Sequence, residues 1–125
     1  MGEDPKRTYD LEERLLSYGA RIIELTRSLS SDYAERHIGN QLLRSGTAPL
    51  SHHGEAQAAE SPADFIHKLR LALKEFCETE RWLKLIARAG LIPKNQNHPL
   101  LLDETDQLVR IFVSSIATAE KRRAK

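Results

Sequence analysis

The stretch DFIHKLRLALKEFCETERWLKLI at residues 64–86 decides the fold class of this chain. Its apolar and small side chains recur alternately three and four residues apart, which places them on one face of an α-helix. That face consists of Phe65, Leu69, Ala72, Phe76, Thr79, Leu83 and Ile86. A face of this kind is typical of a helix that packs in a bundle.

Residues on either side of this stretch predict where the helix begins and ends. Ser61 is a suitable N-cap, Pro62 suits the first helical position, and Asp64 completes a capping-box pattern. Gly90 is a suitable C-terminal residue, and the following Pro93 cannot continue the helix. The helix is therefore expected to run from about residue 62 to about residue 89.

Two other segments show the same alternation. The first helix is expected over about 9–29, with the inward positions Leu11, Leu15, Tyr18, Ile22, Leu25 and Leu29. The last is expected to begin near Asp103, as N-cap with Asp106 at the third position, after a long loop at 90–102 that contains two prolines. Its inward positions are Leu101, Thr105, Leu108, Phe112, Ser115 and Ala119.

The second helical segment is interrupted. Ile38, Leu42 and Ser45 begin an inward face, but Gly46 and Pro49 follow. Because proline removes a helical hydrogen bond, we expect either two helical pieces or one helix kinked near Pro49. The predicted fold is all-α: an antiparallel up-down four-helix bundle with a left-handed twist. It would occupy 9–120, between a polar N-terminal extension (1–8) and a basic C-terminal tail (121–125).

Composition narrows the classes of function. The chain has 125 residues, enough for one domain, and its net charge is only +1, so no global field attracts nucleic acid or an anionic membrane. A single cysteine suits a reducing compartment and excludes an internal disulfide. No apolar run is long enough to span a bilayer, and the N-terminus is polar. These features predict a soluble cytoplasmic protein without membrane contact.

The sequence HHGE at 52–55 raises the question of a metal site. His52 and His53 lie about 100° apart on a helix and cannot face one ion, whereas His52 and Glu55 can. Two ligands are too few for zinc, and the other histidines have no spacing that supplies a third. We therefore expect a polar patch on a helix and no metal or other cofactor.

No catalytic pattern is present, and we expect no enzyme and no small-molecule substrate. Cys77 follows Phe76 in a packed helix, which favours an unreactive buried thiol over a nucleophile. Glu75 and Glu78 could be an acid-base pair, but they could equally form ion pairs, and we favour the structural role. The residues expected in such polar pairing are Arg44, Glu55, Lys74, Glu75 and Glu78.

The tail AEKRRAK at 119–125 is the most basic segment. One explanation is a favourable end for a helix whose dipole is negative there. In an oligomer, however, the tail would be repeated around one face and could bind nucleic acid. The candidate contacts are Lys121, Arg122, Arg123 and Lys125.

Three stretches resemble the small four-helix-bundle proteins first met as reading frames in intervening sequences of bacterial 23S ribosomal RNA genes. They are IGNQLLRSGTAPLSHHGEAQAAES at 38–61, DFIHKLRLALKEFCETERWLKL at 64–85 and, more weakly, LLDETDQLVRIF at 101–112. The resemblance implies a homopentamer. Gly54 and the neighbouring alanines would allow close packing, and the interface candidates are Leu16, Ile23, Leu43 and Leu50.

The resemblance also bears on partners. One related branch provides accessory subunits of diversity-generating retroelements, where a strongly basic pentamer binds nucleic acid and a reverse transcriptase. This chain differs from that branch in its nearly neutral charge. Two hypotheses follow: a non-catalytic oligomeric binding module for RNA, DNA or a reverse-transcriptase-like protein, or a structural, protein-interaction oligomer without affinity for nucleic acid.

Overall fold

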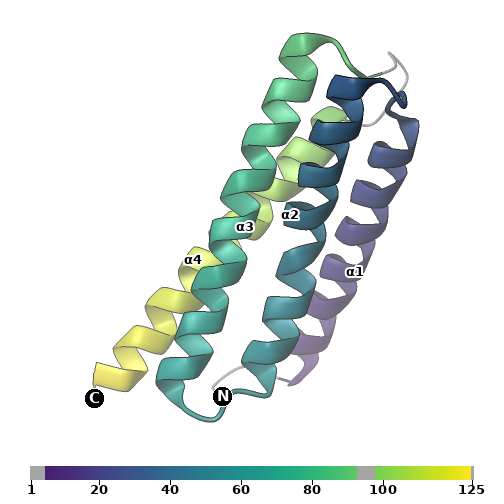
Figure 1. Ribbon diagram of the computed structural model, residues 1–125. Coiled ribbons are helices and arrows are strands. Elements are labelled where there is room, and N and C mark those ends of the chain that lie inside the picture. The colour runs from purple at the N-terminus through teal and green to yellow at the C-terminus, as the bar shows by residue number, and fades with distance from the viewer. Residues whose placement is uncertain (1–4, 93–97, 125) are drawn as a thin grey trace.

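The computed structural model describes residues 5–92 and 98–124, which form four α-helices. They are α1 (Pro5–Ser28), α2 (Tyr33–Gln57), α3 (Pro62–Ala89) and α4 (His98–Ala124). Consecutive helices run in opposite directions (Figure 1). The predicted all-α bundle is confirmed, while its left-handed twist stays a prediction.

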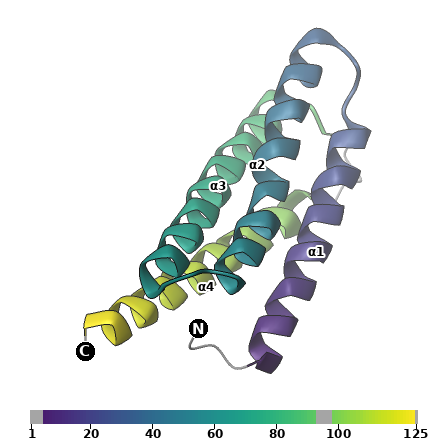
Figure 2. The same ribbon diagram turned by 60° about the horizontal axis from the view of Figure 1, so that its bottom comes forward.

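The helices form a ring of neighbours in chain order. α2 packs against both α1 and α3, α4 packs against α3, and α1 and α4 close the ring (Figures 1 and 2). The α2–α3 pair is the most extensive contact, and the α1–α4 pair is the least. The α2–α3 turn and the C-terminal end of α4 lie at the same end of the molecule (Figure 2).

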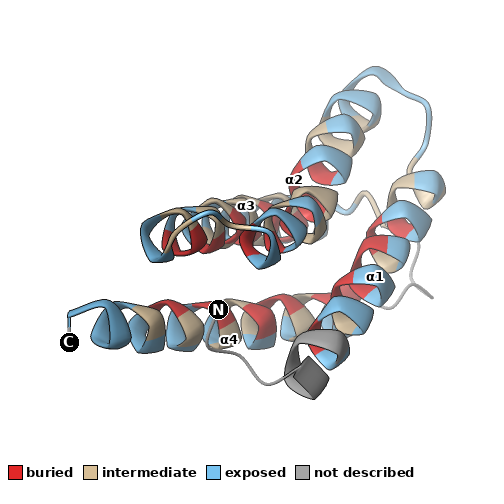
Figure 3. Ribbon diagram, turned by 90° about the horizontal axis from the view of Figure 1, so that it is seen from below, coloured by how far each residue is buried: buried red, intermediate tan, exposed pale blue. Residues whose placement is uncertain are grey.

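The core lies where the buried faces of the helices meet (Figure 3). Every predicted inward position of α3 is buried, as are the predicted positions of α1 up to Leu25. In α4 the predicted positions are buried as far as Phe112, after which Ile116 takes the place of Ser115. At the centre, Phe76 makes edge-on ring contacts with Tyr18 and Phe112. The spacing of apolar residues therefore predicted most of the core.

Capping explains the limits of α3. The Ser61 side chain accepts a hydrogen bond from the Asp64 backbone N–H at 3.0 Å, and Pro62 begins the helix. At the other end, Gly90 adopts the left-handed conformation with φ of 69°, which costs a glycine little. Both predicted limits of this helix are confirmed.

Of the two alternatives predicted for α2, the break near Pro49 is wrong, because one helix continues through the proline, while a kink there stays a prediction. Pro49 is itself buried, on the same stripe as Leu42, Ser45 and His53. A proline inside a helix costs about 3 kcal/mol. Burial of this stripe against the neighbouring helices offsets that cost, which local sequence cannot reveal.

The predicted start of α4 near Asp103 is also wrong. The helix begins at His98, so Pro99 lies in its first turn, where a missing N–H costs nothing. His98 is buried, and its Nε2 donates to the Leu83 carbonyl oxygen at 2.7 Å. Asp103 lies within the helix and accepts from Gln107 Nε2 at 2.8 Å instead of capping it.

Polar contacts join α1 to α4, the pair of helices with the least extensive contact. The Arg14 guanidinium donates to both carboxylate oxygens of Glu104, at 2.6 and 3.2 Å. Deeper in, the hydroxyl groups of Tyr18 and Thr105 lie 2.7 Å apart, and both residues are buried. Burial raises the pKa of Tyr18 above its usual value.

α1 begins at Pro5, so part of the predicted N-terminal extension (1–8) is helical.

None of the helices in the described residues is both long and apolar enough to cross a membrane.

Candidate functional site

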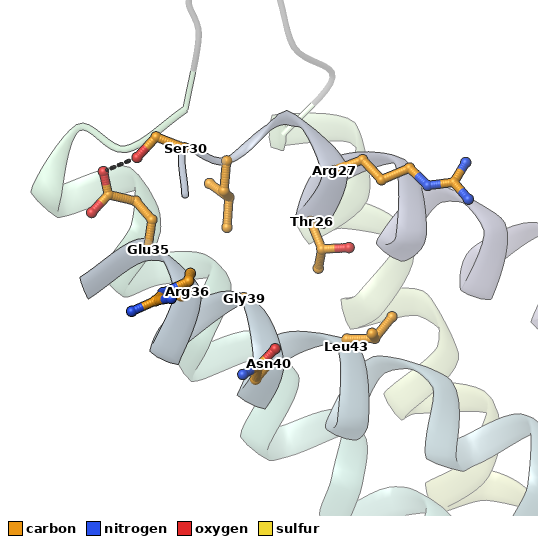
Figure 4. Close-up of a pocket in the computed structure, with 9 residues that line it drawn as sticks. Thr26, Arg27, Ser30, Glu35, Arg36, Gly39, Asn40 and Leu43 are labelled. Carbon is orange, nitrogen blue, oxygen red and sulfur yellow. Dashed lines mark hydrogen bonds between the residues drawn. The ribbon is translucent and has the colours of Figure 1, made fainter. Parts of the chain in front are cut away.

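A hollow of about 220 Å³ lies beside the turn between α1 and α2 (Figure 4). Its hydroxyl groups are already hydrogen-bonded: Thr26 donates to the Ile23 carbonyl oxygen at 2.8 Å, and Ser30 to the Glu35 carboxylate at 2.6 Å. The guanidinium groups of Arg27 and Arg36 point away from each other (Figure 4). The lining residues thus provide no activated nucleophile and no convergent pair of cations for an anion.

An exposed apolar surface adjoins this hollow, and we call it the α1–α2 apolar face. It comprises Leu16 and Ile23 of α1 with Leu43 and Leu50 of α2, and Leu43 also lines the hollow. Leu16 is 46% exposed, and Ile23 and Leu43 are each 38% exposed. Leu50 is half-buried and packs against the core of its own chain. Within each helix the two residues are seven positions apart and therefore share one side.

A polar cluster joins α2 to α3. Arg44 forms ion pairs with Glu75, at 2.9 Å, and with Glu78. The Glu78 carboxylate also accepts from the Trp82 indole N–H at 3.0 Å. The Arg44 side chain is 49% exposed, so this charge lies at the surface of the helix interface. Lys74, which we expected to join the polar pairing, is exposed and has no ion pair with the described residues.

The two histidines of HHGE lie in different environments. His52 Nδ1 is 3.1 Å from a Glu55 carboxylate oxygen, and Lys68 Nζ is 3.6 Å from the other oxygen. The hydrogen bond with His52 and the charge of Lys68 lower the pKa of Glu55. His53 is buried and packs edge-on against Phe112 with ring centroids 6.2 Å apart. His53 therefore lies apart from the polar pair of His52 and Glu55, because it belongs to the stripe of α2 that faces the core.

No group of three or more potential metal ligands occurs within the described part of the chain.

The basic C-terminal segment is the last turn of α4. Lys121, Arg122 and Arg123 are exposed within this helix, so residues 121–124 of the predicted tail continue α4 to its end at Ala124. Lys125 lies outside the described residues. The positive charges of Lys121, Arg122 and Arg123 lie at the negative end of the α4 dipole.

The prediction of a buried Cys77 is wrong, because the thiol is exposed. Cys77 lies about 100° around the helix from the buried Phe76, which turns it toward solvent.

The exposed side of α3 carries a row of basic residues that sequence reasoning missed. We call His67, Arg70, Lys74, Arg81, Lys84 and Arg88 the α3 basic stripe; Cys77 lies in its middle. The sequence contains the pattern that would have predicted this row, since the basic residues recur three and four positions apart, as the buried residues of α3 do.

Comparisons with known proteins agree with this architecture. A family model described as 23S rRNA-intervening sequence protein matches residues 10–114. A crystal structure of a protein with unknown function, from the S23 ribosomal protein family of Bacteroides thetaiotaomicron VPI-5482, is similar with 34% sequence identity and a TM-score of 0.80. That similarity covers 88% of this chain and 97% of the other. No curated protein sequence gives a significant match.

Proposed function

The chain belongs to the 23S rRNA-intervening sequence protein family, and on that premise we propose that it is a non-catalytic, homo-oligomeric binding module for nucleic acid or a nucleic-acid enzyme in the cytoplasm. The observation that carries this proposal is the α1–α2 apolar face. An aligned set of partly exposed leucine and isoleucine side chains is typical of a surface that another protein covers. The expected oligomer is a homopentamer.

The hollow beside the α1–α2 turn supports self-association through this face. It adjoins the apolar residues, and its hydroxyl groups, those of Thr26 and Ser30, are bonded within the chain. A side chain from a second copy could therefore enter without leaving these hydroxyl groups unpaired.

The charge distribution supports nucleic acid as the partner of the assembled protein. Lys121, Arg122 and Arg123 lie at one end of the molecule, and a closed ring would bring the equivalent residues of each copy to the same face. Their combined field would attract phosphate groups even though each chain carries a net charge of only +1.

Light scattering tests the assembly. The expected mass is five times the 14.2 kDa of one chain, and a single-chain mass at micromolar concentration contradicts the proposal. The variant Leu16→Ser/Leu43→Ser is expected to dissociate the oligomer. The matched control is Leu85→Ser/Val113→Ser, which removes the same kind of exposed apolar surface from α3 and α4. If only the control dissociates, the interface lies elsewhere.

A mobility-shift assay with labelled RNA at about 50 mM salt tests the nucleic-acid partner, because electrostatic binding is strong there. We expect weak binding without sequence preference, which deletion of residues 121–125 abolishes. If the oligomeric protein leaves RNA unshifted, the second candidate function takes its place: a protein-interaction oligomer without nucleic-acid affinity. The nearly neutral net charge favours that alternative.

A further inference from the structure

The α3 basic stripe runs along the whole outer side of α3. Its members are exposed, and from His67 to Arg88 they follow a regular alternation of three and four residues if Cys77 is included. At a rise of about 1.5 Å per residue, this row is roughly 30 Å long, and its five lysine and arginine side chains leave their widest gap, about 10 Å, at Cys77. A linear array of that kind suits a linear polyanion.

The positive charge of this row is only partly neutralised within the chain. Arg70 pairs with Glu120, and Lys84 with Glu80 at 3.2 Å. Lys74, Arg81 and Arg88 form no ion pair with other described residues. The two nearest carboxylates toward α2, those of Glu75 and Glu78, are already held by Arg44.

We propose that the α3 basic stripe binds the phosphate backbone of a nucleic acid. This inference rests on the proposed function and names a different surface for it than the last turn of α4. Lysine and arginine on one helical side neutralise phosphates, and arginine adds paired hydrogen bonds to phosphate oxygens. Binding of this type is independent of sequence.

The same surface argues against two other ligands. It contains a single exposed large apolar side chain, Leu85, whereas stable protein interfaces depend on several buried apolar or aromatic anchors. It also lacks an aromatic residue on which unpaired bases could stack. The chemistry therefore favours the backbone of a duplex over a protein helix or a stacked single strand.

Charge reversal provides the first test. In full-length Lys74→Glu/Arg81→Glu, two free cations are replaced while the internal ion pairs remain. We expect affinity for a 20-base-pair RNA duplex to fall at least ~10-fold, and the slope of log affinity against log salt to become shallower by about 2, because each lost phosphate contact contributes about 0.9. The matched control, Arg110→Glu, changes the net charge as much as the single stripe variant Arg81→Glu, at an exposed position off the stripe and away from the α1–α2 hollow. It should change affinity less than about 3-fold.

The single cysteine provides a second measurement that does not depend on affinity. Cys77 is exposed in the middle of the stripe, so a maleimide photo-crosslinker attaches there alone. Illumination of the labelled protein with the duplex should give a covalent adduct. Labelled Lys74→Glu/Arg81→Glu should give little adduct at the same concentration, while labelled Arg110→Glu should retain it.

The results separate this inference from the proposed function. If deletion of 121–125 abolishes duplex binding and the stripe variant binds normally without loss of adduct, the stripe is not the binding surface and the proposed function stands. If only the stripe variant loses binding, the inference stands and the role of the last turn fails. If the intact protein binds poly-L-glutamate but no duplex, the stripe binds acidic protein and the inference fails. If it binds neither polymer, both nucleic-acid proposals fail.

Discussion

Replacing Gly46 by alanine tests the packing of α1 against α2. A Cβ atom at this position would lie 2.8 Å from both Cγ atoms of Ile22 and 2.9 Å from its Cδ1. Ordinary carbon contacts are about 3.5–4.0 Å long, so the new Cβ atom and Ile22 would have to move apart by several tenths of an ångström or more. Ile22 has no exposed surface and is branched at Cβ, which restricts its rotation in a helix. The helices must therefore separate, or Ile22 must adopt a strained rotamer.

The expected magnitude combines two opposing effects. Overpacking of a core costs about 1–3 kcal/mol. Alanine is more favourable than glycine within a helix by about 1 kcal/mol, which offsets part of that cost. The difference is a loss of about 0–2 kcal/mol in the free energy of unfolding, and because all three contacts with Ile22 are shorter than 3.0 Å, we expect Gly46→Ala to fall in the upper half of that range.

Gly54→Ala is the matched control, because it makes the same exchange in the same helix at an exposed position with no atom within 4 Å of the new Cβ. It should raise the free energy of unfolding by about 0.5–1 kcal/mol. The two variants should thus change stability in opposite directions.

Urea unfolding, followed by circular dichroism at equal protein concentrations, measures both variants, since oligomer stability depends on concentration. A double-mutant cycle identifies the cause. Ile22→Ala removes all three close atoms, so its effect and that of Gly46→Ala should not add, with a coupling of about 0.5–3 kcal/mol. Ile22→Val keeps two branches at Cβ and should relieve little. A Gly46→Ala protein at least as stable as the wild type would refute the reasoning.

Two further predictions concern polar contacts. Tyr18→Phe should cost about 1 kcal/mol at pH 8, because the buried hydrogen bond to Thr105 is lost. Since folding raises the pKa of Tyr18, the contribution of its hydroxyl group to the free energy of unfolding is complete below the unfolded pKa near 10 and declines as pH rises further. Urea unfolding at pH 11 should therefore show a smaller difference in stability between the wild type and Tyr18→Phe than at pH 8. An unchanged difference contradicts this. Arg44→Ala should lower the free energy of unfolding by only about 0.5–1 kcal/mol, because the Arg44 side chain that pairs with Glu75 and Glu78 is half-exposed. In about 1 M salt the loss should be smaller. A loss near 3 kcal/mol would mean that the ion pairs behave as buried charges.

Local sequence was sufficient for features that arise within one helix. The side chains that face the core of α1 and α3 follow from helical periodicity, because residues three and four apart share a side whatever surrounds them. The limits of α3 follow from Ser61, Pro62 and Gly90, whose conformational preferences are local. The α3 basic stripe belongs to the same class, since it lies opposite the apolar face and obeys the same spacing.

Tertiary packing decided the remaining features, because they depend on contacts between residues distant in sequence. α2 continues through Pro49 only because its buried stripe packs against neighbouring helices, and no local preference contains that energy. His53 is in the core because it lies on that same stripe and contacts Phe112. Arg44 pairs with Glu75 and Glu78, which were predicted with it as residues of polar pairing, yet the exposure of Arg44 depends on where α2 and α3 meet. A pattern along one helix specifies which side faces inward, whereas the partner helix determines how deeply that side is buried.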